Sequence, residues 1–375
     1  MVEIEKTTLF FLNFVDMKCV YTNFSHELAL GRNLRFYTPP ANVVTMERDL
    51  EDLGRFFCPR GELTYNPFAP VWGWDKCLVN RMRLEGCEGL PDDNILDTIR
   101  NLSSRKIAVD CLCRIKRVCD FLPLEGESAY CDDIESVESV ERLVEGRQCV
   151  LKQPYSGSGR GLISVKGGLL SKQRDWAIKT LREQGGLVVE PFYRKVSDFA
   201  MEFLVTQDVV EYEGLSLFST SVDFSYAGNV LAPQNVLRQR LETCLGRNFV
   251  VALRDVLTGV LHDVFVGNYL GYLGVDMMLV AVDGEIFVHP CVEINVRRTM
   301  GLLSLELAKL VSSGCEGLFS IVFKGGEGEL SRLVAEGCGC VFDGCGRLES
   351  GEMFLNKIDS NTHFGAMIKV VGDCR

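Results

Sequence analysis

The stretch that most constrains this fold is residues 148–161, where a short apolar run meets a glycine-rich loop. The run Gln-Cys-Val-Leu-Lys ends at Lys152, and the loop Ser-Gly-Ser-Gly-Arg-Gly spans residues 156–161. Such a loop offers many free backbone N–H groups, little side-chain bulk and the fixed positive charge of Arg160. These properties suit a phosphate group. The glycines alone are a weak signal, because any tight turn can produce them.

The segments that flank the loop narrow its interpretation. Residues 149–152 and 161–166 both read as β-strands, and the next helix is expected only from residue 171. A dinucleotide-binding fingerprint needs a helix that starts on its last glycine, and a Walker loop ends in Gly-Lys-Ser/Thr, so both are excluded. What remains is a glycine-rich hairpin folded over a nucleotide, with an ordinary hairpin turn as the alternative.

A second feature is a predicted β-hairpin over residues 271–297. Asp283 and Gly284 separate two β-rich runs and predict a two-residue turn. In that register Asp276 faces Cys291. The alternation of side chains then places four residues of the second strand on the face of Asp276: Cys291, Glu293, Asn295 and Arg297.

The polar residues of this face suit a divalent cation. Asp276, Glu293 and Asn295 supply two carboxylates and an amide oxygen, ligands of the kind that Mg²⁺ prefers. Carboxylates so close together are costly unless a cation lies between them. The alternative is a solvent-exposed face with an incidental salt bridge, which the apolar neighbours disfavour. His289 is expected on the same face, and we interpret it as a hydrogen-bonded structural residue.

Composition excludes several function classes. Of the 375 residues 47% are hydrophobic and 24% charged, and the net charge of −11 argues against a nucleic-acid groove. We expect no membrane span, because no run of about 18 apolar residues occurs. The N-terminus lacks the features of a signal peptide, so we expect a cytoplasmic protein whose 16 cysteines are reduced. The cluster of Cys338, Cys340 and Cys345 lacks the paired spacing of a zinc site.

The two features together resemble the ATP-grasp superfamily. Residues 150–161 look like its phosphate-covering hairpin, residues 188–193 like its adenine hinge, and residues 276–297 like its magnesium and catalytic strands. The last motif is similar to that of biotin carboxylase and the carbamoyl-phosphate synthetase class. The resemblance implies two α+β lobes that hold ATP between them, preceded by a Rossmann-like α/β domain.

This resemblance also implies a division of the chain. The expected parts are residues 1–115, an α/β domain with a buried strand at 7–15; 116–205, the N-lobe with the hairpin; 206–311, the C-lobe with the magnesium strands; and 312–375, a small appendage. The motif Trp-Gly-Trp-Asp at residues 72–75 has no chemistry that we can derive. Its tryptophans are interpreted as core residues, with a substrate pocket as the alternative.

The resemblance assigns nucleotide-binding roles. Lys152 reaches the ATP phosphates, and Lys106 is the first ATP lysine, with Arg105 as its rival. Glu190 accepts a hydrogen bond from the adenine amino group. Asp198 meets the ribose, with Glu202 as the alternative. The other implied nucleotide-binding residues are Tyr193, through its backbone, and the loop residues Ser156, Gly157, Ser158, Gly159, Arg160 and Gly161.

Catalytic roles follow from the same resemblance. Asp276, Glu293 and Asn295 hold one or two Mg²⁺, while Arg297 and Lys152 stabilise charge during transfer. The implied activity joins a small-molecule carboxylate, or a peptide, to an amine or thiol through an acyl phosphate, with release of ADP and phosphate. A homodimer is one expected assembly. The alternatives are a phosphotransferase of the same fold and a non-catalytic ATP-binding regulatory protein.

Overall fold

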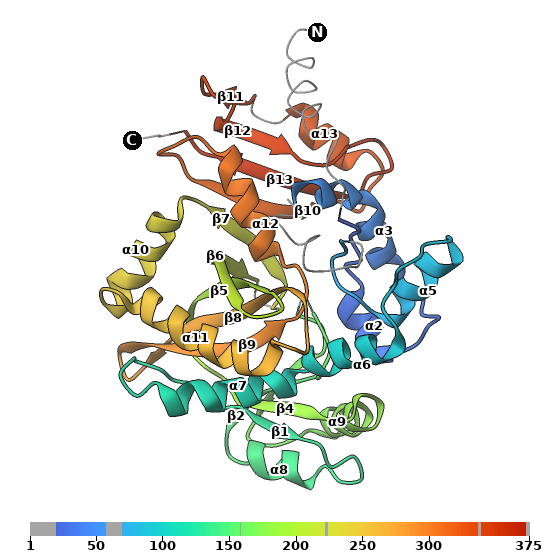
Figure 1. The fold of residues 1–375 in the computed structure, drawn as a ribbon, viewed down its shortest axis with the longest axis vertical. Coiled ribbons are helices and arrows are strands. Elements are labelled where there is room, and N and C mark those ends of the chain that lie inside the picture. Colours follow the sequence, from blue (N-terminus) through green and yellow to red (C-terminus); the bar gives the residue numbers. More distant parts are fainter. Residues whose placement is uncertain (1–19, 58–69, 158, 222–223, 337–338, 373–375) are drawn as a thin grey trace.

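Two antiparallel β-sheets organise the chain (Figure 1). The computed structural model describes residues 20–57, 70–157, 159–221, 224–336 and 339–372. One sheet has four strands in the order β1-β4-β2-β3, and the other has nine in the order β11-β12-β13-β10-β7-β6-β5-β8-β9. Each sheet carries helices, so the predicted α+β lobes are confirmed.

The first part of the chain is helical where it is described. Its elements are α2 (His26–Arg32), α3 (Ala41–Asp49), η1 (Glu51–Phe56), α5 (Lys76–Leu84), α6 (Asp93–Leu102) and α7 (Arg105–Val118). An isolated parallel bridge joins Tyr21 to Val71. The strand predicted at residues 7–15 lies outside the described residues, so the Rossmann-like sheet stays a prediction.

The small sheet and two helices form the first lobe. Its elements are β1 (Ala129–Cys131), α8 (Glu138–Val144), β2 (Gln148–Lys152), β3 (Leu162–Lys166), α9 (Ser171–Gln184) and β4 (Leu187–Pro191). Apolar side chains of the sheet, α8 and α9 share one core, which includes Val140, Leu151 and Leu181. The glycine-rich loop connects β2 to β3 at one end of this sheet.

The large sheet forms the second lobe. Its elements are β5 (Lys195–Val205), β6 (Val210–Thr220), β7 (Tyr226–Leu231), α10 (Gln234–Leu245), α11 (Phe249–Phe265), β8 (Gly271–Val282), β9 (Glu285–Asn295), α12 (Met300–Leu307), η2 (Ala308–Leu310), β10 (Gly317–Phe323), α13 (Glu329–Glu336), β11 (Val341–Phe342), β12 (Leu348–Phe354) and β13 (Phe364–Val370). Because β10 pairs with β7, the segment predicted as an appendage continues this sheet. Strand β5, predicted in the N-lobe, pairs with β6 and β8 and belongs to the large sheet too.

Helices cover both faces of the large sheet. On one face α7, α10 and α11 pack on alternate residues of β5 and β8, such as Phe199 and Val275. On the other, η1 and α12 share a core with β10, β12 and β13. Helix α7 contacts both β9 and β1, so it lies where the two lobes meet (Figure 1).

Two expectations from composition concern the helices and the cysteines. Among the described residues, every helix is too short or too polar to cross a membrane. Eleven described cysteines are free thiols, including Cys340 and Cys345 of the C-terminal cluster. Cys315 is disulfide-bonded, so the expectation of reduced thiols is wrong at that residue.

Candidate active site

The hairpin of β8 and β9 has the turn that the sequence predicts. Asp283 and Gly284 have φ values of 50° and 90°, the positive values that the favoured two-residue hairpin turn requires. Val282 pairs with Glu285 on either side of this turn. The predicted turn is therefore confirmed.

The three predicted magnesium ligands lie together on one face of the large sheet, here called the carboxylate face. Asp276 pairs with Glu293 across the strands, and Asn295 Nδ2 donates a hydrogen bond to Asp276 Oδ2 at 3.0 Å. The adjacent Val275 and Ile294 belong to the apolar core. The alternation of a β-strand thus separates polar from apolar residues here, as expected.

One part of the predicted register is wrong. A β-bulge sets residues 290–292 of β9 against the single residue between Asp276 and Met278, so Asp276 faces Glu293 instead of Cys291. Cys291 is 2% exposed and packs in the apolar core with Ile294. Pro290 supplies a physical reason, because a proline has no N–H to donate to the ladder.

Negative charge accumulates on this face. Desolvation and then the charges of Glu293 and Glu202 raise the pKa of Asp276 well above its ordinary value. Glu202 of β5 is 1% exposed, and burial raises its pKa to about 7. This shift persists although Thr299 and Ser216 donate hydrogen bonds to Glu202 at 2.7 and 3.3 Å. A bound cation would relieve the repulsion between these carboxylates.

Arg105 joins the two lobes at this face. Its guanidinium donates to Glu293 Oε1 at 2.7 Å, to Ser156 Oγ at 2.7 Å and to Ser156 O at 2.9 Å. A further bond, at 2.6 Å, goes to the carbonyl of Gln153. Arg105 is 4% exposed. Because Ser156 belongs to the glycine-rich loop, one buried cation holds the loop against a predicted magnesium ligand.

Lys106, which the sequence favoured over Arg105, lies elsewhere. Its Nζ is 3.5 Å from Asp132 and 5.3 Å from the centre of the Tyr130 ring, and its side chain is 50% exposed. Arg105 shares the buried side of α7 with Ala108, three residues on, whereas Lys106 does not. The role of Lys106 stays a prediction, and Arg105 is the cation that reaches the carboxylates in this conformation.

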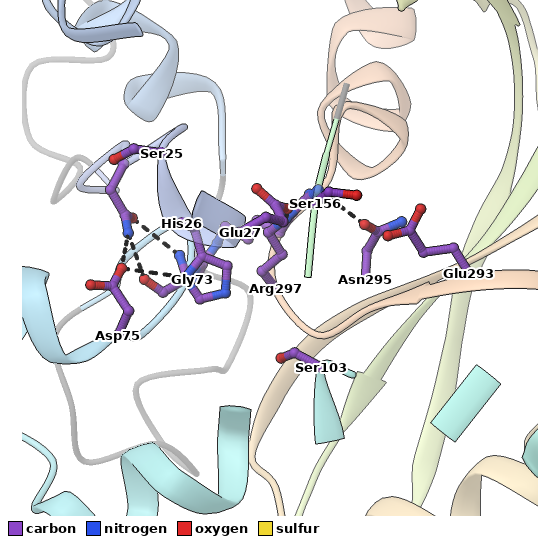
Figure 2. Close-up of polar contacts among 12 residues, drawn as sticks. Ser25, His26, Glu27, Gly73, Asp75, Ser103, Ser156, Glu293, Asn295 and Arg297 are labelled. Atoms are coloured by element: carbon purple, nitrogen blue, oxygen red, sulfur yellow. Dashed lines mark hydrogen bonds and ion pairs between the residues drawn. The ribbon is translucent and has the colours of Figure 1, made fainter. Parts of the chain in front are cut away.

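Arg297 follows β9 and contacts the N-terminal helices. Its guanidinium donates to Asn295 Oδ1 at 3.0 Å, pairs with the carboxylate of Glu27, and lies 5.2 Å from the centre of the Trp72 ring. Burial alone would raise the pKa of Glu27, but the charge of Arg297 brings it below its ordinary value. Helix α2 therefore supplies one wall of the site (Figure 2). Sequence reasoning missed Glu27, since no local pattern links residues 270 positions apart.

Two predicted nucleotide-binding residues of the small lobe bind each other. Lys152, at the end of β2, forms a buried ion pair with Glu190 of β4. The two residues are 6% and 3% exposed, and Ser128 Oγ donates to Glu190 Oε1 at 3.0 Å. Burial would raise the pKa of Glu190, but the Lys152 ammonium brings it below its ordinary value.

The glycine-rich loop has a backbone that requires glycine at two points. Gly159 and Gly161 have φ values of 74° and 67°, which side chains other than glycine rarely adopt. Within the loop the N–H of Arg160 donates to the carbonyl of Gly157 at 3.1 Å. The loop connects two antiparallel strands, as predicted. Ser158 lies outside the described residues.

The predicted adenine and ribose partners lie next to the small lobe. Tyr193 Oη accepts a hydrogen bond from the N–H of Glu127 at 2.7 Å. Asp198 pairs with Lys195 at 2.6 Å and accepts from Thr220 Oγ1 at 3.0 Å. Asp198 stays the predicted ribose partner, since its alternative, Glu202, lies on the carboxylate face.

His289 is not the hydrogen-bonded structural residue that we expected. It is fully buried, and neither ring nitrogen has a hydrogen-bond partner among the described residues. Its ring lies edge-on to Tyr193, with the ring centres 5.5 Å apart. Burial lowers the pKa of His289 to about 4, although the charge of Glu190 opposes the shift. The imidazole is therefore neutral at physiological pH.

The residues of the carboxylate face fit a Mg²⁺ ion that is bound by few protein side chains. Within the described ranges, no three His, Cys, Asp or Glu side chains gather as a metal site. Mg²⁺ commonly uses one or two carboxylates together with water and substrate phosphates. Asp276 and Glu293 match that pattern, and the raised pKa of Asp276 marks an unmet need for positive charge. In this conformation Asn295 Oδ1 faces Arg297, so the amide must turn to become a ligand.

Comparison with known proteins finds structural similarity alone. No protein-family model matches the chain, and no curated protein matches it in sequence. A carboxyaminoimidazole ribonucleotide synthase from Aspergillus clavatus, complexed with ATP, is 14% identical, with a TM-score of 0.45 over 78% of this chain and 74% of that one. An L-amino acid ligase from Bacillus licheniformis is 14% identical, with a TM-score of 0.44 over 86% and 80% of the two chains.

A biotin carboxylase from Campylobacter jejuni is also similar, at 10% identity and a TM-score of 0.44, over 74% of this chain and 64% of that one. These proteins are ATP-grasp ligases. The chain is similar to these proteins in fold, at low sequence identity. Likeness at this level assigns no function, so function has to be argued from the site.

Proposed function

We propose that this chain is an ATP-dependent ligase that joins a small-molecule carboxylate to an amine through an acyl phosphate, with release of ADP and phosphate. One observation carries the proposal. Arg105 bonds both Ser156 of the glycine-rich loop and Glu293 of the carboxylate face. A loop suited to phosphates and a face suited to Mg²⁺ therefore meet at one buried cation.

The residues at this junction suit phosphoryl transfer. In the proposal, Asp276, Glu293 and Asn295 hold Mg²⁺, which when bound neutralises phosphate charge. Arg297 binds the substrate carboxylate and then stabilises the acyl phosphate, because a guanidinium presents paired donors to such groups. The glycine-rich loop covers the phosphates and keeps water away from the acyl phosphate.

Two cations of the site already hold carboxylates, which supports the assignment of anion-binding roles. Arg297 pairs with Glu27, and Lys152 pairs with Glu190. Each cation is thus positioned by the fold to bind an anionic oxygen. A phosphate or a substrate carboxylate would take the place of a protein carboxylate at these positions.

The test is ADP release from Mg-ATP, screened against the proteinogenic amino acids and common dicarboxylic acids, each with and without pooled primary amines. We expect ADP and phosphate that depend on both co-substrates. Glu293→Gln should lower turnover roughly 100-fold or more, because it removes a charge that acts in the transition state. The matched control is Glu285→Gln, the same change at the exposed start of the same strand, which should keep normal turnover.

Two outcomes would contradict the proposal. One is formation of AMP and pyrophosphate, since an acyl phosphate pathway releases ADP. The other is nucleotide binding without ADP release in any pool, which would indicate a non-catalytic binding protein. A melting curve of Glu293→Gln accompanies the assay, because that residue also pairs with Arg105.

A further inference from the structure

A chain of buried polar side chains leads from the N-terminal helices to the candidate active site. His26, the first residue of α2, is 1% exposed, and its Nδ1 lies 3.4 Å from Asp75 Oδ2. Asn23 Nδ2 donates to the same carboxylate oxygen at 3.0 Å. The other oxygen of Asp75 accepts from the N–H of Leu78 at 2.9 Å and caps α5. The carboxylate is therefore fixed, and it orients the imidazole.

The motif at residues 72–75, which the sequence left unexplained, builds this arrangement. Trp72 lies under the guanidinium of Arg297. Gly73 lies flat against the imidazole of His26, because a Cβ at that position would come within 2.8 Å of three ring atoms. Asp75 meets the edge of the ring at Nδ1. The tryptophan is buried, as expected, but it also touches the site.

The second ring nitrogen of His26 has no protein partner. Of the buried side-chain atoms without a hydrogen-bond partner in the described ranges, His26 Nε2 is the one whose residue lines a cavity with Ser156, Asn295 and Arg297. In Figure 2 the ring lies between Asp75 and Arg297. A buried polar atom without a partner is costly, so a fold that keeps one commonly reserves it for a ligand.

The cavity that His26 lines is small. It has room for about 10 Å³, which is close to a single water. That space suits the reacting amino group of a substrate and excludes its larger parts. Glu27, beside His26, is committed to Arg297, whose charge brings the pKa of this carboxyl below its ordinary value. Glu27 is therefore a weak proton acceptor.

We infer that His26 is the general base of the ligation step, with Asp75 as its positioning residue; this rests on the proposed ligase function. The amine nitrogen attacks the carbonyl carbon of the acyl phosphate. A C–N bond forms, and the bond between the carbonyl carbon and the bridging oxygen of the phosphate breaks. Inorganic phosphate leaves with the electron pair of that bond. The proton lost by the amine passes to His26 Nε2, while Nδ1–H remains bonded to the carboxylate of Asp75.

The experiment compares two nucleophiles in the same enzyme. Mg-ATP and the pooled proteinogenic amino acids are supplied either alone, so that amino groups act as nucleophile, or with hydroxylamine, which traps acyl phosphates as hydroxamates without a base. In His26→Gln the ratio of peptide-type ligation to hydroxamate formation should fall 100-fold or more, within the range that general bases contribute. His262→Gln, an exposed histidine of α11, should leave the ratio unchanged.

The outcomes separate the inference from the function beneath it. If the wild type forms no hydroxamate and no ADP, both are overturned. If hydroxamate forms but His26→Gln lowers both products equally, or neither, His26 is structural and the inference is overturned. Should His26→Gln fail to fold, Asp75→Asn takes its place, because asparagine keeps a capping oxygen for α5. A tenfold fall of the ratio in that variant supports the inference, and an unchanged ratio overturns it.

Discussion

The two lobes each bury an ionisable cluster, and they balance charge in opposite ways. In the small lobe Lys152 and Glu190 neutralise each other, and Ser128 completes the hydrogen bonds. On the large sheet burial, and then the charges of Glu293 and Glu202, raise the pKa of Asp276 well above its ordinary value. One cluster is complete as folded, while the other has surplus negative charge.

This difference shows which lobe depends on a ligand for its stability. A matched buried pair costs little once formed, but removal of one partner leaves an uncompensated charge. Carboxyl groups with raised pKa values destabilise the fold at neutral pH, because the unfolded chain releases its protons more readily. Such a cost is typical of sites where function sets the residues. Four predictions test the comparison, from the largest effect to the smallest.

Lys152→Met should destabilise the protein by about 3–5 kcal/mol, because Glu190 is left buried without its cation. Urea unfolding at neutral pH measures the change. The double variant Lys152→Met/Glu190→Gln should regain most of the loss. Equal destabilisation in the single and the double variant would show that the pair is not what stabilises the small lobe.

Glu202→Gln should stabilise the protein by about 3 kcal/mol above pH 7. The figure follows from the rise in the pKa of Glu202 from 4.5 to about 7, at 1.36 kcal/mol for each pKa unit. Because the folded pKa is raised, the cost of Glu202 is absent below pH 4.5, grows as the pH rises and is complete above about pH 7. Unfolding free energies across this range measure the gain. The control Glu211→Gln, exposed on β6, should show no such pH dependence.

When Mg²⁺ is present at a hundred times its Kd for the ADP-bound protein, the wild type should be about 2.7 kcal/mol more stable than with ADP alone. Asp276→Asn should lose most of this increment, yet be more stable than the wild type without ligand at neutral pH, because its surplus charge is gone. Thermal melts in the presence and absence of Mg²⁺ measure both changes. An Asp276→Asn protein that keeps the full increment would place the metal elsewhere.

Lys106→Gln should change stability by less than about 1 kcal/mol, because Lys106 and Asp132 form an exposed pair that belongs to neither cluster. Arg105→Lys, one position earlier, should cost more, since an ammonium lacks the forked donors that reach Ser156 and Glu293 together. Urea unfolding compares the two variants. A loss from Lys106→Gln as large as that from Arg105→Lys would show that the exposed pair contributes to stability after all.

The sequence predicted the parts of the site that depend on a short turn and on the two-residue alternation of side chains along a strand. The Asp283-Gly284 turn and the two-residue alternation of β9 brought Asp276 and Glu293 together, because both signals act within one hairpin. The same alternation failed at Cys291, where the bulge next to Pro290 adds residues to one strand. A proline inside a strand was the available signal for that interruption.

Other residues of the site depend on a weaker local pattern or on long-range packing. Arg105 and Lys106 are adjacent cations, and the rotation of α7 decides which one is buried; the small apolar stripe that begins at Ala108 carried that information. His26 and Glu27 reach Arg297 from the far end of the chain, so their contact depends on how helices pack over the sheet. Tertiary packing of this kind leaves no periodic trace in the sequence.

The bonds of Arg105 have a consequence for how the site opens. One guanidinium serves Ser156, Gln153 and Glu293, and these bonds occupy all four donors of its two terminal nitrogens. Its fifth donor, Nε–H, is buried without a partner among the described residues. A phosphate that takes these donors must release the loop and the carboxylate together. Binding of an anion to Arg105 would then free Glu293 to bind a metal ion. By thermodynamic linkage, each binding event would favour the other by the same free energy.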